Sequence, residues 1–177
     1  DIRYSVERFK RRGLKYNPDF VIWLTHDEDR YQINELLFPA INKFGSEMKK
    51  SGEYQKEVEG GNIYPEWGEA RDYVENMLGT ESILKEQREY FDQFKSIYPK
   101  KLLLVTFPST DEKYMGILKD FDKANDTVEL LSDITDIQEN ENYVQQDGHP
   151  TVEGHKMIAK DIYNYLVDKV ITCSSPL

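Results

Sequence analysis

An aspartate and a histidine, Asp147 and His149, stand two residues apart near the carboxyl end of the chain. A carboxylate that accepts a hydrogen bond from one imidazole nitrogen fixes the orientation of the ring, and the other nitrogen can then take a proton. Such a pair supplies the acid and the base of a nucleophilic triad. The third member, a nucleophile, has to come from elsewhere.

A helix that follows the histidine is expected to fix the position of this pair. Thr151 is placed as the N-cap of that helix, and Glu153 lies in its first turn. Apolar residues then recur at steps of three and four, at Ala159, Ile162, Leu166 and Val170. His149 therefore lies on a loop just outside the amino end of a helix.

This segment resembles the last sequence block of the SGNH, or GDSL-type, hydrolases. In that family a loop carries the catalytic aspartate and histidine, a proline often follows the histidine, and a Gly-His pair leads into the final helix. The matching residues are Asp147, His149, Pro150, Gly154 and His155. The common family spacing would place the acid at Gln146, one residue earlier. The resemblance implies that His149 is the base, that Asp147 orients it, and that His155 anchors the loop on the helix.

A second match follows a predicted strand at residues 19–25, whose continuous apolar run is typical of a buried parallel strand. The strand ends in a polar loop at the position where open α/β sheets bind ligands. SGNH proteins have a Gly-x-Asn-Asp motif at such a strand end, and its Asn helps to hold the oxyanion. Aligned on Asp27, this chain has Leu24 for the Gly and His26 for the Asn. A histidine N–H could donate to the oxyanion in place of the Asn, so His26 and Asp27 are candidates for an oxyanion or substrate loop.

The same loop has another interpretation, because residues 26–29, His-Asp-Glu-Asp, could bind a metal ion together with His149 or His155. That arrangement would indicate a metal-dependent hydrolase. The spacing matches no strong metal signature, and a solvated acidic loop is favoured. We therefore expect no metal and no other cofactor.

Apolar runs and helical patterns alternate along the rest of the chain. Further strands are predicted at residues 101–107 and 127–131, and helices at 33–50, 69–78, 82–97 and 111–123. This alternation predicts right-handed βαβ units and a parallel sheet that is covered on both faces. The expected fold class is α/β, with a three-layer α/β/α, flavodoxin-like sheet as in the SGNH hydrolases. Residues 1–177 are interpreted as a single domain, the C-terminal portion of an SGNH-like domain.

The nucleophile of the family lies in a Gly-Asp-Ser block after the first strand, and this chain contains no such block. We expect that block to precede Asp1, because Val6, Phe9 and Leu14 have the pattern of a helix that leads into the strand at residues 19–25. A sheet without its first two strands exposes an edge. The missing N-terminal segment or a partner should cover that edge.

Ser109 is the best internal alternative for the nucleophile, because it follows the predicted strand at residues 101–107. No glycine flanks this serine to form a nucleophile elbow. The pattern favours a serine that starts a turn or caps the next helix.

Composition limits the partners further. The formal net charge of −10 disfavours nucleic acid and anionic membranes, which are bound by Lys and Arg. No apolar run is long enough to span a bilayer, and the single cysteine, Cys173, excludes an intrachain disulfide. Residues 51–67 resemble an insertion loop, in which Tyr64 and Trp67 either stack on a sugar or, as we favour, pack the loop.

The sequence therefore predicts a hydrolase that acts on carboxylic esters, with O-acyl groups on carbohydrate as the expected substrates by analogy with the family. In this interpretation an upstream serine attacks the acyl carbon, and His149 takes and returns the proton. The alternative is a catalytically silent SGNH-like domain that binds a glycan or a protein partner. The replaced Gly-x-Asn-Asp motif favours that alternative, whereas Asp147 and His149 favour the enzyme.

Overall fold

A computed structural model describes residues 2–27, 29–32, 35–62, 64–108, 110–137, 142–144 and 149–170. Its centre is a three-stranded parallel sheet in the order β1-β2-β3. The strands are β1 (Phe20–Leu24), β2 (Lys101–Val105) and β3 (Val128–Leu131). Parallel strands need long crossover connections, and here helices supply them. The prediction of an α/β protein with parallel strands is confirmed.

The helices lie before, between and after the strands. Their bounds are α1 (Ile2–Arg8), α2 (Asp29–Gln32), α3 (Leu37–Ser51), α4 (Glu53–Glu59), α5 (Pro65–Leu78), α6 (Thr80–Ile97), α7 (Glu112–Lys123) and α8 (Val152–Tyr165). A π-helical turn, Phe9–Gly13, and a 3-10 turn, Leu14–Tyr16, extend α1, and a π-helical segment, Leu166–Val170, extends α8. No helix in the described ranges combines the length and the apolar character that a membrane crossing needs.

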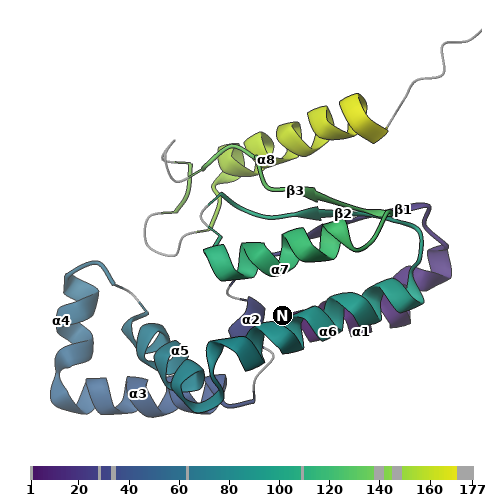
Figure 1. The fold of residues 1–177 in the computed structure, drawn as a ribbon. Coiled ribbons are helices and arrows are strands. Elements are labelled where there is room, and N and C mark those ends of the chain that lie inside the picture. The colour runs from purple at the N-terminus through teal and green to yellow at the C-terminus, as the bar shows by residue number, and fades with distance from the viewer. Residues whose placement is uncertain are drawn as a thin grey trace, which may run out of the picture.

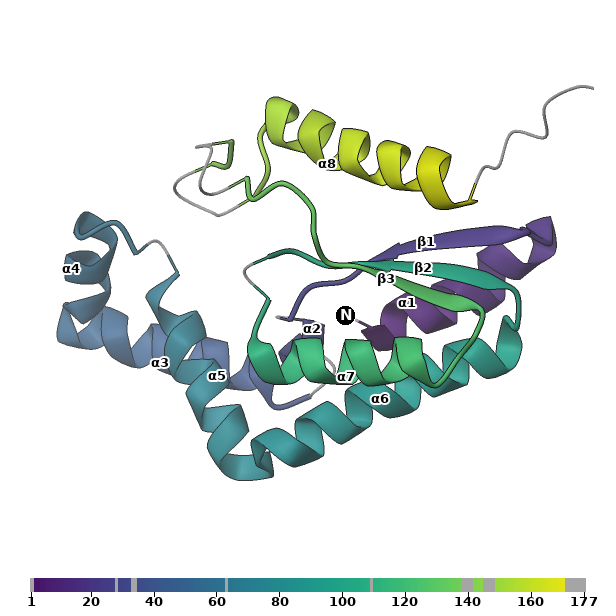
Figure 2. The ribbon, with the colours of Figure 1, turned by 45° about the horizontal axis from the view of Figure 1, so that its top comes forward.

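Helices cover both faces of the sheet (Figures 1 and 2). On one face α1, α6 and α7 bury the largest apolar cluster, in which Trp23 and Leu104 of the sheet contact Phe91 and Phe94 of α6. On the other face α8 covers a smaller cluster. Buried apolar side chains that alternate between the two faces of β2 explain why its sequence is a continuous apolar run.

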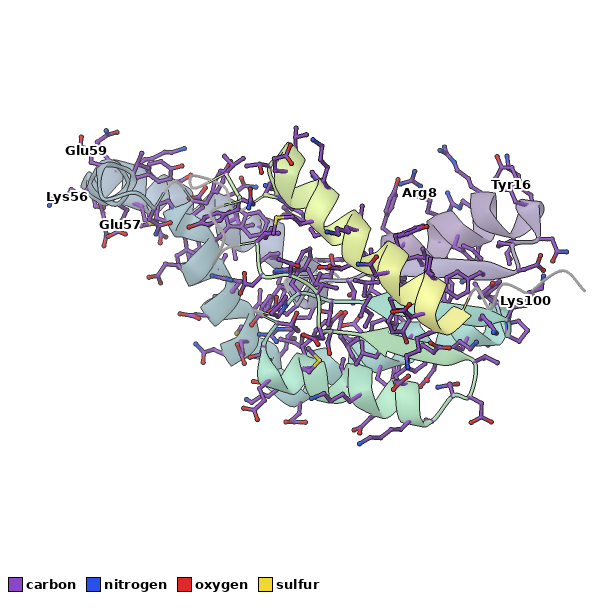
Figure 3. The ribbon with its side chains drawn as sticks, turned by 90° about the horizontal axis from the view of Figure 1, so that it is seen from above. Arg8, Tyr16, Lys56, Glu57, Glu59 and Lys100 are labelled. Carbon is purple, nitrogen blue, oxygen red and sulfur yellow. The ribbon has the colours of Figure 1, made fainter. Side chains whose placement is uncertain are left out.

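Helices α3, α4 and α5 form an arm beside the sheet (Figure 1). The arm has its own apolar cluster, which includes Leu37, Ala70 and Val74. Its point farthest from the sheet is α4, where Lys56, Glu57 and Glu59 project into solvent (Figure 3). The arm lies at the end of the sheet where the strands terminate, so it borders the site described below (Figure 2).

The prediction that residues 51–67 form a loop is wrong, because α4 and the first turn of α5 lie within them. Gly52 adopts a left-handed conformation, with φ 76°, that ends α3 and lets α4 start directly afterwards. Pro65 opens α5 at its first position, where a missing N–H costs nothing. Trp67 packs against the apolar cluster of the arm, whereas Tyr64 is exposed.

The final helix, α8, has the predicted N-cap, but its buried face differs from the prediction at one position. Thr151 is the N-cap, since its hydroxyl accepts a hydrogen bond from the Gly154 N–H at 3.2 Å. The buried face contains Ile158 together with Ile162 and Leu166, whereas Ala159 is exposed. The apolar stripe is therefore shifted by one residue at its start, because Ile158 rather than Ala159 faces the sheet.

Candidate functional site

The candidate site lies at the carboxyl edge of the sheet. The chain segments that leave β1, β2 and β3 all emerge at this edge, and α8 also begins there (Figures 1 and 2). Open parallel sheets bind ligands at such an edge, because loops rather than neighbouring strands surround it. His26 and Asp27 follow β1, and His149 precedes α8, so the two predicted parts of the site lie at the same edge of the sheet.

His26 and Asp27 form an acid–histidine pair. The His26 Nδ1 lies 3.0 Å from the Asp27 Oδ1, and the second carboxylate oxygen of Asp27 accepts the Asp111 N–H at 3.2 Å. The His26 ring packs beside Phe107, with 5.6 Å between the ring centroids. Because the His26 side chain is 45% exposed and that of Asp27 only 16%, the carboxylate holds the ring from the protein side.

The environment of Asp27 favours its charged form. Burial raises the pKa of this carboxyl, but hydrogen bonding and the charge of His26 lower it, and the Asp111 N–H and Arg30 lower it further. The net pKa lies below the usual value, so Asp27 is a carboxylate at neutral pH. Both of its oxygens are used, one by His26 and one by the Asp111 N–H.

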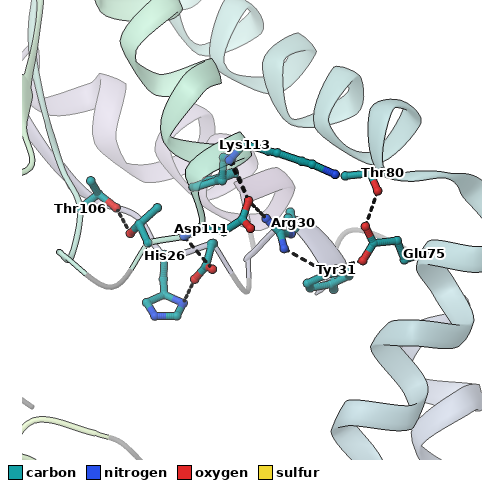
Figure 4. Close-up of polar contacts among 11 residues, drawn as sticks. His26, Arg30, Tyr31, Glu75, Thr80, Thr106, Asp111 and Lys113 are labelled. Carbon is teal, nitrogen blue, oxygen red and sulfur yellow. Dashed lines mark hydrogen bonds and ion pairs between the residues drawn. The ribbon is translucent and has the colours of Figure 1, made fainter.

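A second carboxylate, Asp111, extends this network to the helical arm (Figure 4). Asp111 is the N-cap of α7 and accepts the N–H groups of Lys113 and Tyr114, both at 3.0 Å. The Arg30 guanidinium donates to the same carboxylate at 2.8 Å. Burial raises the pKa of Asp111, but these hydrogen bonds and the charge of Arg30 outweigh it and hold the pKa below its usual value.

Arg30 joins the strand ends to α5. Its guanidinium also donates to the Tyr31 hydroxyl at 2.8 Å, and Tyr31 donates to Glu75 at 3.2 Å. Glu75 in turn accepts the Thr80 hydroxyl at the start of α6 (Figure 4). This continuous chain of polar contacts fixes the loop after β1 relative to the arm.

The floor of the site consists of buried hydroxyl groups. The Thr25 and Tyr114 hydroxyls lie 2.7 Å apart, and so do those of Thr106 and Thr110. Burial raises the pKa of Tyr114 well above its usual value. Tyr114 is therefore a neutral hydrogen-bonding group that ties α7 to the end of β1.

The loop that carries His149 is held through its backbone. The His149 carbonyl accepts the Val144 N–H at 2.7 Å, and Tyr143 and Pro150 form an antiparallel bridge. The Asn142 carbonyl accepts both the N–H and the hydroxyl of Thr151, at 3.0 and 3.1 Å. The His149 side chain itself is exposed.

Gly154 allows this loop to lie directly on α8. A Cβ atom at this position would overlap with the Asn142 carbonyl and press against the Pro150 ring. The glycine of the predicted motif is thus needed for close packing. His155 is exposed, and its backbone N–H donates to the Thr151 carbonyl at 2.9 Å. Among the described contacts, Thr151 and Gly154 rather than the His155 side chain hold the loop on the helix.

The remaining predictions concern the acid Asp147, the alternative nucleophile Ser109, a metal site and a sugar-stacking platform. Asp147 and Ser109 lie outside the described residues. Within the described part of the chain, no three His, Cys, Asp or Glu side chains are grouped as a metal site would require. Trp67 is partly buried against the apolar cluster of the arm, as the packing interpretation expects, whereas Tyr64 is exposed.

The chain has no match among protein-family models, curated proteins or solved structures. The functional interpretation therefore depends on the residues of the site and their geometry.

Asp111 and Arg30 are functional-site residues that the sequence interpretation missed. Asp111 was expected only as the start of a helix, and its position directly before that helix is the one signal that marks an N-cap. Arg30 gives no comparable signal, because its partner lies 81 positions away in the sequence. Only the parallel pairing of β1 with β2 brings the two residues together.

Proposed function

We propose that the protein is a hydrolase of carboxylic esters that uses a Ser-His-Asp mechanism, with the serine supplied from outside residues 1–177. The observation that carries the proposal is the placement of two histidine-containing segments at one sheet edge. His149 precedes α8 on a loop fixed by its backbone, and His26 follows β1 beside an ionised Asp27. Acyl transfer needs both segments close together. The base that accepts the proton and the group that donates a hydrogen bond to the oxyanion must act on the same acyl group.

In the proposed mechanism each residue of the predicted site has a defined task. His149 takes the proton of the serine hydroxyl as that oxygen attacks the acyl carbon, and later returns it to the leaving alcohol. Asp147 accepts a hydrogen bond from the His149 ring and sets its orientation. His26 donates its Nδ1–H to the Asp27 carboxylate and, as an imidazolium, donates its Nε2–H to the oxyanion in place of the Asn that SGNH hydrolases use. Water then attacks the acyl-enzyme with His149 as the base.

A flavodoxin-like SGNH fold is part of the same proposal. The order β1-β2-β3 with parallel strands is compatible with the last three strands of such a sheet. The side of β1 that faces away from β2 is the place where further strands would add. Gly154 supports the resemblance to the last SGNH sequence block, because the loop and α8 lie too close together at this position for a residue with a side chain.

Acyl groups on carbohydrate remain the proposed substrates, by analogy with the family. Tyr64, at the amino end of α5, is one of two exposed aromatic side chains in the described part of the arm, with Phe38 of α3, and offers a ring to a sugar. Cofactor chemistry is not needed for this reaction.

A second function has one observation in its favour. Leu24 and His26 stand where SGNH hydrolases have Gly and Asn, and the His26 Nδ1 is engaged with Asp27. A domain with this altered oxyanion motif could bind a glycan or a protein without turning over an ester. A rate measurement separates the two functions.

The test is turnover of p-nitrophenyl acetate by a protein that includes the sequence preceding Asp1. We expect His149→Ala to lower turnover by several orders of magnitude with nearly unchanged melting temperature, because its side chain is exposed. His155→Ala, which removes an exposed histidine of α8, is the matched control and should retain activity. Residues 1–177 alone should be inactive. Equal turnover of both variants, or no turnover by the longer protein, would favour the binding function.

A further inference from the structure

Within the part of the chain that the structure describes, the outer side of β1 is an unpaired sheet edge. The Thr25 N–H donates to the Val105 carbonyl, so the backbone groups of Thr25 face β2. Because these groups alternate between the two sides of a strand, the N–H and C=O of Ile22 and Leu24 point away from β2. Among the described residues no strand pairs with them. An unpaired edge of this kind is a template for another strand.

The apolar side chains next to this edge are also uncovered. Ile22 is 44% exposed and Leu24 is 47% exposed, although both belong to the central sheet. They lie on the face of the sheet that α8 covers farther along, as shown by their neighbour Phe20, which packs with Leu103 and Val105. A strand beside β1 would cover Ile22 and Leu24 with apolar side chains of its own.

An open groove of ≈ 480 Å³ runs along the same edge on the other face of the sheet. It is lined by Val21 and Trp23 of β1, by Phe94 of α6, and by Ser5, Arg8, Phe9, Arg12 and Tyr16 from α1 and its extension. Figure 3 shows α1 extending beyond β1 on the side away from β3, with Arg8 and Tyr16 on its outer part. The helix thus forms a shelf beneath the place where another strand would lie.

The shelf has a charge opposite to that of the whole chain. Residues 2–16 contain Arg3, Arg8, Lys10, Arg11, Arg12 and Lys15, with Glu7 as the only acid. The complete chain carries a net charge of −10. Arg8 and Arg12 line the groove and form no ion pair with any described residue, since the Glu7 carboxylate pairs with Lys10. Carboxylates on an added strand would complement these two guanidinium groups.

We propose that this groove, with the free edge of β1, docks an extended segment of the same protein from outside residues 1–177, in which apolar and acidic side chains alternate. The segment pairs with β1 as a further strand. Its apolar side chains lie beside Ile22 and Leu24, and its carboxylates point to the opposite face, toward Arg8 and Arg12. A second copy of this chain is disfavoured, because edge-to-edge pairing would bring two arginine-rich shelves together. The proposal rests on the fold proposed above, in which further strands add beside β1, and its test is independent of ester hydrolysis.

The test is binding of two synthetic peptides to residues 1–177, one with alternating valine and glutamate and one with alternating valine and lysine. We expect the glutamate peptide to bind at least about tenfold more tightly, and the charge reversal Arg8→Glu with Arg12→Glu to invert that preference. Lys119→Glu, on the exposed side of α7, is the control for a change of charge and should leave the preference unchanged.

Amide hydrogen exchange identifies strand pairing within the same experiment. The N–H groups of Ile22 and Leu24 should become protected when the glutamate peptide binds, since they face the added strand. The proposal is overturned if neither peptide binds, if both bind equally, or if binding leaves these amides unprotected. If the Ile22 and Leu24 amides become protected without peptide, and more so at higher protein concentration, a second copy of the chain occupies the edge. That result would also overturn the proposal.

Discussion

Two histidines at the carboxyl edge of the sheet are held in different ways. His26 is fixed through its side chain, by Asp27, which is itself fixed by the Asp111 N–H. His149 is exposed, and the described contacts that fix its position are backbone contacts, such as the bond from the Val144 N–H. The first histidine therefore belongs to a network that also stabilises the fold. Changes in the network around His26 should alter stability, whereas a change of the His149 side chain itself should alter mainly turnover.

Among changes in the surroundings of the two histidines, the largest effect is expected from Gly154→Ala, which places a Cβ atom against the Asn142 carbonyl. The loop has to move away from α8, and a shift of about 1 Å at a catalytic group costs about hundredfold in turnover. The free energy of unfolding should fall by about 1–3 kcal/mol, as for other overpacking changes. Turnover and chemical denaturation of the same variant measure both effects.

Gly116→Ala is the matched control, because Gly116 lies in α7 and no atom lies within 4 Å of a Cβ built there. A helical Gly→Ala change with free space should stabilise by about 1 kcal/mol. Gly154→Ala with normal turnover would show that the loop does not depend on its close approach to α8.

A smaller effect is expected where the network of His26 meets α7. Asp111→Ala removes the N-cap and the partner of Arg30, and should lower the free energy of unfolding by about 2 kcal/mol. Asp111→Asn keeps a capping side chain and loses the charge, so we expect about half of that effect. Thermal unfolding of the two variants separates capping from charge. Equal destabilisation by both would show that the charge on Asp111 carries the whole effect.

The smallest expected effect is a dependence of stability on pH. Asp27 and Asp111 both have a pKa that the folded protein holds below the usual value of 3.8. Their contribution to stability is therefore complete above the unfolded pKa and is lost as pH falls through the folded pKa. Asp27→Asn should be less stable than the parent protein at neutral pH, and the difference should shrink below about pH 4. A difference that grows on acidification would contradict the assigned direction.

The strands and the long helices could be predicted because their signals are local. The run Leu102 to Val105 and the stripe in α8 are apolar patterns that specify an element without knowledge of its neighbours. The helix α4 was missed because Gly60-Gly61 and Tyr64-Pro65 are turn signals that suggested a loop, whereas Gly60 lies at the end of a short polar helix. That helix has no buried residue, so its sequence has no apolar periodicity from which a helix could be predicted.

The candidate site was predictable in part for the same reason. Thr151 and Gly154 lie within a few residues of His149, and the motif therefore contains the geometry that holds the loop. The contacts of Asp27 with Asp111, and of Asp111 with Arg30, join segments more than 80 positions apart. Such contacts depend on which strands become neighbours, and no local pattern encodes that choice.

The central claim is that Asp147 and His149, rather than Asp27 and His26, perform the proton transfer. Turnover of p-nitrophenyl acetate should be compared between Asp147→Asn and Asp27→Asn in a protein that includes the sequence preceding Asp1. We predict that Asp147→Asn lowers turnover by up to about four orders of magnitude at unchanged melting temperature. Asp27→Asn should lower the melting temperature and reduce turnover much less. Near-normal turnover of Asp147→Asn, together with inactive but folded Asp27→Asn, would contradict the claim and move the base to His26.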